Sequence, residues 1–163
     1  MAQQATAETE NPAHAPHVEI DPAGRSLTAT VTLPASAERV FHAIASREIT
    51  LWWVRPGVFD TQTWEGDVRV GGRWQTSGDF RGEPYTLEGQ FAEVRPPTAL
   101  AHTWTNPARP APSSTVRYDV EPIASGTRLT LRHGDFPVRE ATEANAAGWE
   151  TSLRRLAELL SVS

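Results

Sequence analysis

One change of hydrophobic period, near residue 138, constrains the possible folds of this chain more than any other feature. Between residues 58 and 133, apolar and polar residues alternate in short runs separated by turn residues, the pattern of half-buried β-strands. Beyond residue 138, Trp149, Leu153 and Leu156 begin a stripe that continues at Leu160 with the spacing i, i+4, i+7, i+11. That spacing places the four side chains on one face of an α-helix. The sequence therefore predicts an antiparallel sheet followed by one long amphipathic helix over residues 138–160.

Turn residues divide the remaining chain into about six or seven strands and two short helices. Ser36 is a suitable N-cap for a first helix, and a second helical stretch covers residues 47–53. Short turns between consecutive strands favour antiparallel pairing, so we expect an α+β fold. The strands are expected at residues 26–33, 58–64, 70–76, 85–94, 100–104, 116–120 and 129–133, with a turn at Ser77-Gly78-Asp79 after the third of them.

Small residues on the long helix predict a hollow interior. Ala141, Asn145, Gly148 and Ser152 lie beside the apolar stripe, where they would face the sheet. A single helix about 10 Å wide cannot fill the concave face of a strongly curved sheet. We therefore expect a cavity between the sheet and this helix.

Composition excludes several classes of protein. The chain has 163 residues, with 15 basic and 20 acidic side chains and a net charge of −5, which argues against phosphate-driven nucleic-acid binding. It contains no cysteine, so disulfides and thiolate metal sites are excluded. No apolar run reaches the ~18–20 residues of a membrane span, and the first residues do not resemble a secretory signal. We expect a cytoplasmic protein and interpret the absence of lysine as the codon bias of a GC-rich bacterial genome.

The predicted domain organisation is simple. Residues 1–24 are rich in Ala, Glu, Gln, Thr and Pro and show no apolar period, so we expect a disordered N-terminal tail. Residues 25–163 are long enough for a single domain with its own core.

Several short motifs, in this order, resemble those of a known superfamily. They are PASAERVF at residues 34–41, Trp52-Trp53, VGGRW at residues 70–74, LAHTW at residues 100–104, and Gly148-Trp149 followed by the leucine stripe. The chain resembles the SRPBCC (START-like, helix-grip) superfamily over about residues 26–161. It is similar to the branch named after the C-terminal domain of the heat-shock protein 90 ATPase activator. The resemblance implies a helix-grip fold, in which a curved antiparallel sheet wraps around a long C-terminal helix, with two short helices between strands 1 and 2.

The same resemblance leaves function open. Helix-grip proteins include ligand carriers, cyclases and hormone receptors, so the fold alone does not assign an activity. The eukaryotic activator also has a separate N-terminal chaperone-binding domain, whereas here about 25 low-complexity residues precede the fold.

Aromatic residues at inward positions are the main candidates for a ligand site. Large rings bury ~150–250 Å² each, so they can form either a solid core or the lining of a pocket for a flat apolar ligand. Six tryptophans in a fold expected to be hollow favour the pocket. The candidate ligand-binding residues are Trp52, Trp53, Trp64, Trp74, Tyr85, Phe91, His102, Trp104, Tyr118, His133, Trp149 and Leu153.

His102 and His133 are the polar members of this set. Both have the inward parity of their strands, where an imidazole could hydrogen-bond a ligand or act as a general base. The alternative is a buried histidine whose hydrogen bonds are made within the protein. We assign no catalytic residue, no metal ligand and no cofactor, because no HExxH or paired-histidine spacing is present.

Three hypotheses follow from the sequence. The preferred one is a helix-grip protein that binds a small hydrophobic or aromatic ligand in an internal cavity. The second is a cyclase, dehydratase or hydrolase acting on such a ligand through one of the two histidines. The third is a chaperone cofactor or stress-response module that works through its outer face. In each case we expect a monomer or homodimer with neither a nucleic-acid nor a membrane partner.

Overall fold

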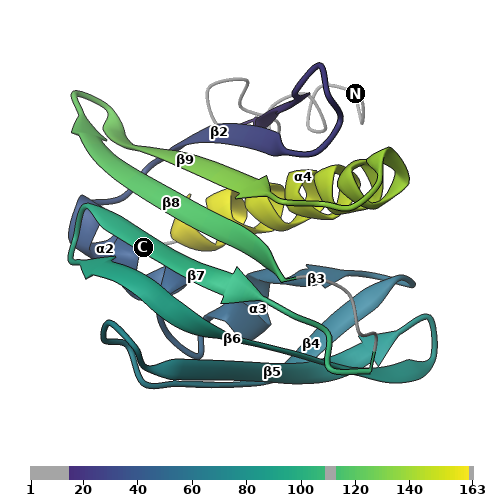
Figure 1. The fold of residues 1–163 in the computed structure, drawn as a ribbon. Helices are drawn as coiled ribbons and strands as arrows, with labels where there is room; N and C mark the ends of the chain where they lie inside the picture. Colours follow the sequence, from purple (N-terminus) through teal and green to yellow (C-terminus); the bar gives the residue numbers. More distant parts are fainter. Residues whose placement is uncertain (1–14, 109–112, 162–163) are drawn as a thin grey trace, which may run out of the picture.

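Nine antiparallel strands form one sheet in the computed structural model, which describes residues 15–108 and 113–161 (Figure 1). The order across the sheet is β1-β2-β9-β8-β7-β6-β5-β4-β3. The α+β helix-grip architecture is confirmed, and the strand count within the described residues exceeds the predicted six or seven. The strands are β1 (His17–Ile20), β2 (Leu27–Leu33), β3 (Val54–Arg55), β4 (Phe59–Gly66), β5 (Arg73–Phe80), β6 (Glu83–Arg95), β7 (Ala99–Trp104), β8 (Ser114–Ile123) and β9 (Gly126–Gly134).

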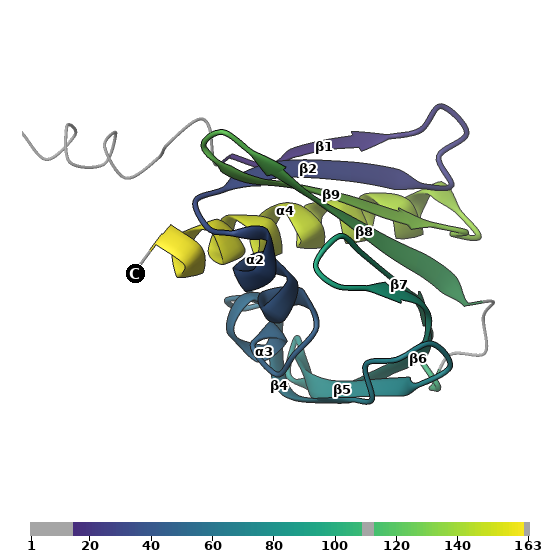
Figure 2. The ribbon, with the colours of Figure 1, turned by 90° about the vertical axis from the view of Figure 1, so that its left-hand side faces the viewer.

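The sheet bends around its helices. Figure 2 shows it curving from β1 and β2 round to β4 and β5, with α4 (Arg139–Ser161) along its concave side. Two irregularities in strand pairing, between Thr61 and Thr63 in β4 and between Phe91 and Glu93 in β6, help this bend because a bulge kinks a strand. No helix of the described residues is long and apolar enough to cross a membrane.

The two short helices that the sequence predicts pack on the sheet beside α4. Ser36 caps α2 (Ala37–Ile44) as expected, since its hydroxyl accepts the Arg39 backbone N–H at 3.2 Å. Five of the eight α2 residues are buried, and this helix packs on β8 and β9. The single-turn helix α3 (Ile49–Trp52) packs on β4 and α4. The concave face is therefore covered by three helices instead of one.

The boundaries of β5 differ from the prediction, which placed a strand at residues 70–76 and a turn at residues 77–79. The strand runs through to Phe80, and the chain reverses at Arg81 and Gly82, which both have positive φ. Gly78 is needed for a different reason, because a side chain there would collide with the backbone oxygen of Asp60 on β4. The predicted turn is therefore wrong, because Gly78 is required by close packing between β4 and β5.

The folded chain also begins earlier than predicted. Strand β1 lies within the segment 1–24 that was expected to be disordered, and it pairs with β2 from His17 opposite Thr30 to Ile20 opposite Leu27. The turn after β1 is tied to α4, because the Thr142 hydroxyl donates to the Gly24 carbonyl at 2.6 Å. A four-residue edge strand is too short to show a convincing period. Residues 1–14 of the predicted tail lie outside the described residues.

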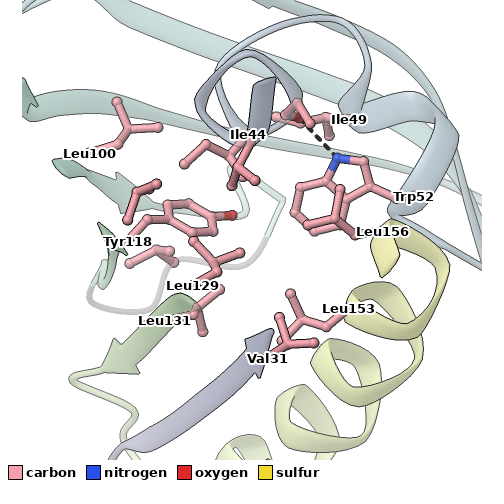
Figure 3. Close-up of a cluster of buried hydrophobic side chains, with 14 of the residues drawn as sticks. Val31, Ile44, Ile49, Trp52, Leu100, Tyr118, Leu129, Leu131, Leu153 and Leu156 are labelled. Atoms are coloured by element: carbon pink, nitrogen blue, oxygen red, sulfur yellow. Dashed lines mark hydrogen bonds between the residues drawn. The ribbon is translucent and has the colours of Figure 1, made fainter. Parts of the chain in front are cut away.

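The core lies between the concave face and the helices. Figure 3 shows Leu153 and Leu156 of α4 turned towards Val31, Leu129 and Leu131 of the sheet. The predicted stripe is thereby confirmed, since Trp149, Leu153, Leu156 and Leu160 are all buried.

Candidate functional site

Ten aromatic rings from both layers meet in the interior, and we call this group the ring cluster. Neighbouring centroids lie 4.4–6.5 Å apart, mostly in tilted or edge-to-face arrangements. The cluster consists of Trp52, Trp53, Trp74, Phe91, His102, Trp104, Tyr118, His133, Phe136 and Trp149.

Trp53 and Trp104 hold the centre of the ring cluster. Their centroids are 5.1 Å apart, and both rings also contact Trp74 and Trp149. Trp53 directly follows α3 and is buried, whereas Trp104 ends β7 and is half-buried. Trp104 is accordingly the ring of the cluster with the most access to solvent.

His133 forms hydrogen bonds through both ring nitrogens. The Trp149 indole N–H donates to His133 Nδ1 at 3.0 Å, and His133 Nε2 lies 2.7 Å from the Ser114 hydroxyl. An indole nitrogen can only donate, so Nδ1 must be the unprotonated nitrogen and Nε2 must carry the hydrogen. Nε2 therefore donates to Ser114 and cannot remove its proton. The pair has the spacing of a serine–histidine dyad with the opposite proton arrangement.

His102 differs from His133 in its bonding. Its Nδ1 lies 3.0 Å from the Thr103 carbonyl oxygen, which can only accept, so Nδ1 carries the hydrogen and Nε2 keeps its lone pair. Burial lowers the pKa of His102 to about 4 and that of His133 to about 3, since both rings are removed from water. Both imidazoles are therefore neutral at physiological pH.

Two polar atoms in the ring cluster have no hydrogen-bond partner among the described residues. They are the indole nitrogen of Trp53 and the hydroxyl of Tyr118, and both side chains are buried. Burial raises the pKa of Tyr118 and the neighbouring Trp53 indole opposes that rise, so the two side chains lie next to each other. Figure 3 shows the Tyr118 hydroxyl directed away from β8, towards Trp52.

Two other indoles near Trp53, those of Trp52 and Trp74, donate to backbone carbonyls. Trp52 donates to the Ala43 carbonyl at 2.9 Å, near the C-terminal end of α2 where helix carbonyls lack internal partners. Trp74 donates to the Thr103 carbonyl at 3.1 Å. The unpaired state of Trp53 is therefore a local exception.

The structure brings together most of the predicted ligand-binding residues. Trp64 and Tyr85 lie outside the ring cluster: the Trp64 ring covers Gly66, and the Tyr85 hydroxyl is 2.8 Å from that of Thr61. Leu153 lies in the apolar core. The remaining nine predicted residues belong to the cluster.

Sequence analysis missed Phe136 and Ser114. Phe136 lies 4.4 Å from the His133 ring, in a loop where no period applies. Ser114 has the same strand parity as Val116 and Tyr118, so alternation along β8 could have identified it.

Two pockets of the described residues lie away from α4. A pocket of about 400 Å³ is bordered by Glu65, Asp67 and Arg73, and one of about 450 Å³ by Glu19, Asp21 and Arg132. No residue of α4 lines either of them. Neither of these two pockets is the internal cavity that the sequence predicts, so that cavity stays a prediction.

The chemical character of the ring cluster is neutral. No Asp, Glu or Arg is found among the buried residues of the described chain. Nor do these residues gather three or more His, Asp or Glu side chains in a group that could hold a metal ion. The cluster offers aromatic surface and a few uncharged hydrogen-bonding atoms.

Comparisons with known proteins agree with this architecture. A family model described as "Activator of Hsp90 ATPase homolog 1-like protein" matches residues 34–161. A crystal structure from Nitrosomonas europaea is 27% identical, covers 86% of this chain and 97% of its own, and superposes with a TM-score of 0.73. The AHSA1 protein from Silicibacter pomeroyi is 27% identical, with 84% and 98% coverage and a TM-score of 0.71.

A third structure supports the fold alone. It comes from Chromobacterium violaceum, is 23% identical, covers 85% of this chain and 99% of its own, and has a TM-score of 0.78. No functionally curated protein matches the chain.

Proposed function

We propose that this chain, which belongs to the Activator of Hsp90 ATPase homolog 1-like family, binds a small apolar or aromatic molecule within the ring cluster. The observation that carries the proposal is the pair of buried polar atoms, on Trp53 and Tyr118, that have no partner in the described protein although aromatic rings surround them.

The energetic argument concerns these two atoms. A buried donor without a partner costs about 1–3 kcal/mol relative to a paired one. Folded proteins retain few such groups, and a ligand atom can supply the missing partner. A bound molecule would recover part of this cost while its apolar surface contacts the surrounding rings.

Trp104 supports a route into the ring cluster. Its half-buried ring contacts Trp53, Trp74 and Trp149, so rotation of this one side chain would open the centre of the cluster to solvent. A ligand would replace ring–ring contacts with ring–ligand contacts of similar geometry, each worth about 0.5–1.5 kcal/mol beyond the buried area.

The test is a binding screen with two matched variants. The full chain is titrated with neutral aromatic compounds and Nile red while tryptophan fluorescence and the melting temperature are recorded. We expect quenching and a raised melting temperature for at least one compound. Trp104→Leu should weaken binding about fivefold or more. Trp64→Leu, which alters a buried tryptophan outside the ring cluster, should leave the affinity nearly unchanged.

Two results would reject the proposal. One is a complete absence of binding across the screen. The other is equal weakening by both substitutions, because that would indicate an effect of general stability and not of the ring cluster.

A further inference from the structure

We propose that strand β1 pairs with β1 of a second copy of this chain, which joins two sheets edge to edge in an antiparallel, two-fold symmetric dimer. The pairing is centred on Val18, so that Val18 of one copy lies opposite Val18 of the other. This interface lies at the rim of the sheet and does not depend on ligand binding in the ring cluster.

Strand β1 is an open edge of the sheet. Its only strand partner among the described residues is β2, and Figure 2 shows β1 along the upper rim of the sheet. The Asp21 N–H donates to the Ser26 carbonyl at 3.0 Å, and bonding groups alternate along an antiparallel pair. The main-chain N–H and C=O groups of Val18 and Ile20 therefore point away from β2, where another strand can bind them.

The side chains of β1 are complementary to a second β1. His17 and Glu19 are exposed on the outer face of the sheet, and His17 Nε2 lies 3.1 Å from Glu19 Oε1. Antiparallel pairing about Val18 places His17 of each copy opposite Glu19 of the other. Imidazoles and carboxylates would then alternate across the interface, both along each strand and between the strands.

This arrangement distinguishes a second copy from an arbitrary strand. Charged residues on an edge strand usually prevent pairing with other chains. Here His17 and Glu19 lie two residues apart and differ in kind, so an antiparallel copy of the same strand satisfies both of them. A strand of another sequence would leave them opposite unrelated side chains.

The same register satisfies the main chain. The Val18 residues of the two copies would exchange N–H and C=O groups, and the Ile20 N–H of each would donate to the Pro16 carbonyl of the other. Pro16 has no N–H, so the pairing ends there. On the inner face, Val18 is partly buried against the core and would contact Val18 of the second copy.

A pocket beside this edge provides room for the second copy. It has a volume of about 450 Å³, and Glu19, Ile20, Thr28 and Arg132 are among the residues that border it. Glu19 lies opposite Thr28, and Thr28 lies opposite Arg132, so the pocket is on the outer face of β1, β2 and β9. His17 of the second copy, placed opposite Glu19, would lie at its border.

The other edge of the sheet is less suited to pairing. Strand β3 contains only Val54 and Arg55, and Pro56 follows it directly. Pairing of β1 with β3 would also be head-to-tail, which leaves an edge free on each copy and produces open chains instead of a dimer.

Sedimentation equilibrium of the full chain, from about 1 µM to about 1 mM, tests the association. A pairing of this size is at the low end of protein interfaces, so we expect a dissociation constant on the order of tens of micromolar. His17→Glu and Glu19→Arg should each weaken the dimer about five- to tenfold, although they change the net charge in opposite directions. The two substitutions together should restore the affinity to within about threefold of the wild type. Arg55→Glu, at the opposite edge, should leave it unchanged.

Two substitutions of Val18 test the register. Val18→Pro removes the central donor, which does not face β2, so the variant should stay monomeric while circular dichroism shows a folded chain. The chain contains no cysteine, so Val18→Cys introduces a single thiol. It should form an intermolecular disulfide on mild oxidation, because directly opposite Cα atoms lie about 5.5 Å apart. His17→Cys should not, since the two thiols would be diagonal neighbours, about 7–8 Å apart.

Three results would overturn the proposal, and none of them bears on ligand binding. The first is a monomer at every concentration. The second is a dimer that persists in Val18→Pro or is cross-linked by His17→Cys but not by Val18→Cys. The third is a series of species larger than a dimer that grows with concentration, which would indicate head-to-tail pairing of β1 with β3.

Discussion

The surroundings of His133 and those of Trp53 lie in the same ring cluster but treat their polar atoms in opposite ways. Trp149 contacts both side chains, with centroids 6.1 Å from His133 and 5.8 Å from Trp53. Around His133 each ring nitrogen is hydrogen-bonded to a protein side chain. Around Trp53 and Tyr118 two buried polar atoms have no partner in the described protein.

This difference distinguishes two kinds of buried polar group within one core: those whose hydrogen bonds are complete and those that lack a partner. A polar group whose hydrogen bonds are complete stabilises the fold and has nothing left for a ligand. A polar group without a partner weakens the fold and can bind something from outside. His133, one of the two histidines that the sequence offered as a candidate base, has both ring nitrogens bonded within the protein, whereas Trp53, marked only for its aromatic surface, is the group proposed to contact a ligand.

Replacing His133 should have the largest effect. His133→Leu retains much of the volume but leaves the Trp149 indole N–H without a partner, whereas the Ser114 hydroxyl keeps the Trp104 carbonyl as an acceptor at 3.4 Å. We expect the free energy of unfolding to fall by about 3 kcal/mol, because a buried orphan donor costs about 1–3 kcal/mol and the ring contact with Phe136 is also lost. Urea denaturation at pH 7.5 measures the change.

His102→Leu is the comparison for that variant. The Thr103 carbonyl would keep the Trp74 indole as a donor, so the expected loss is only about 1 kcal/mol. A loss equal to that of His133→Leu would contradict the contrast between a fully bonded and a partly bonded imidazole.

Acidification should reduce stability through the same two histidines. Their pKa values are lowered from 6.5 to about 4 and about 3 in the folded protein, so the unfolded chain binds more protons below pH 6.5. The stabilisation is complete above that pH and decreases as the pH falls towards 4. We expect a loss of about 1.3 kcal/mol for each histidine, roughly 2.5 kcal/mol together, between pH 7 and pH 5.5, measured by urea denaturation at several pH values.

In this pH range, protonation of Asp21 and Glu93 contributes little to the change in stability. Hydrogen bonds lower the pKa of Asp21 and Glu93, so their contribution is lost only below about pH 4.5. Constant stability from pH 7 to pH 5 would show that the histidines are not buried in their neutral form.

Two neighbouring tryptophans provide a closer comparison of paired and unpaired donors. Trp52→Phe removes the donor to the Ala43 carbonyl at the end of α2, whereas Trp53→Phe removes a donor that has no partner. Both substitutions remove a similar ring area from buried positions. We expect Trp52→Phe to cost about 1–2 kcal/mol more in unfolding free energy. Equal losses would indicate that the Trp53 N–H finds a partner in solution.

The smallest predicted effect concerns Gly148, which lies next to Trp149 on α4. A Cβ added there would meet Phe59 Cε1 at 3.7 Å, an ordinary contact, so Gly148→Ala should stabilise the helix by about 0.5–1 kcal/mol. A thermal melt measures the gain. A lower melting temperature for Gly148→Ala than for the wild type would contradict this expectation.

Periodicity predicted the parts of the fold that depend on one segment at a time. The leucine stripe of α4, the Ser36 cap and the inward parity of His102, Tyr118 and His133 all agree with the structure. Each of these features depends on how an element presents one face to a core, which local spacing encodes.

The features that periodicity missed depend on close approaches between distant segments. Strand β1 is too short to show a pattern, and Gly78 reflects contact with Asp60 and not a turn. The prediction also assumed that α4 alone covers the sheet, whereas α2 and α3 pack on the concave face as well.

The sequence by itself therefore determined the helix-grip class, the apolar faces and the aromatic character of the interior. Only the tertiary structure decided which of the buried polar atoms are paired. The Ser114–His133 contact joins residues 19 positions apart, and the missing partner of Trp53 becomes visible only when every neighbouring segment is in place. Hydrogen bonding requires distances near 3 Å and defined angles, and no linear pattern of residue types specifies these.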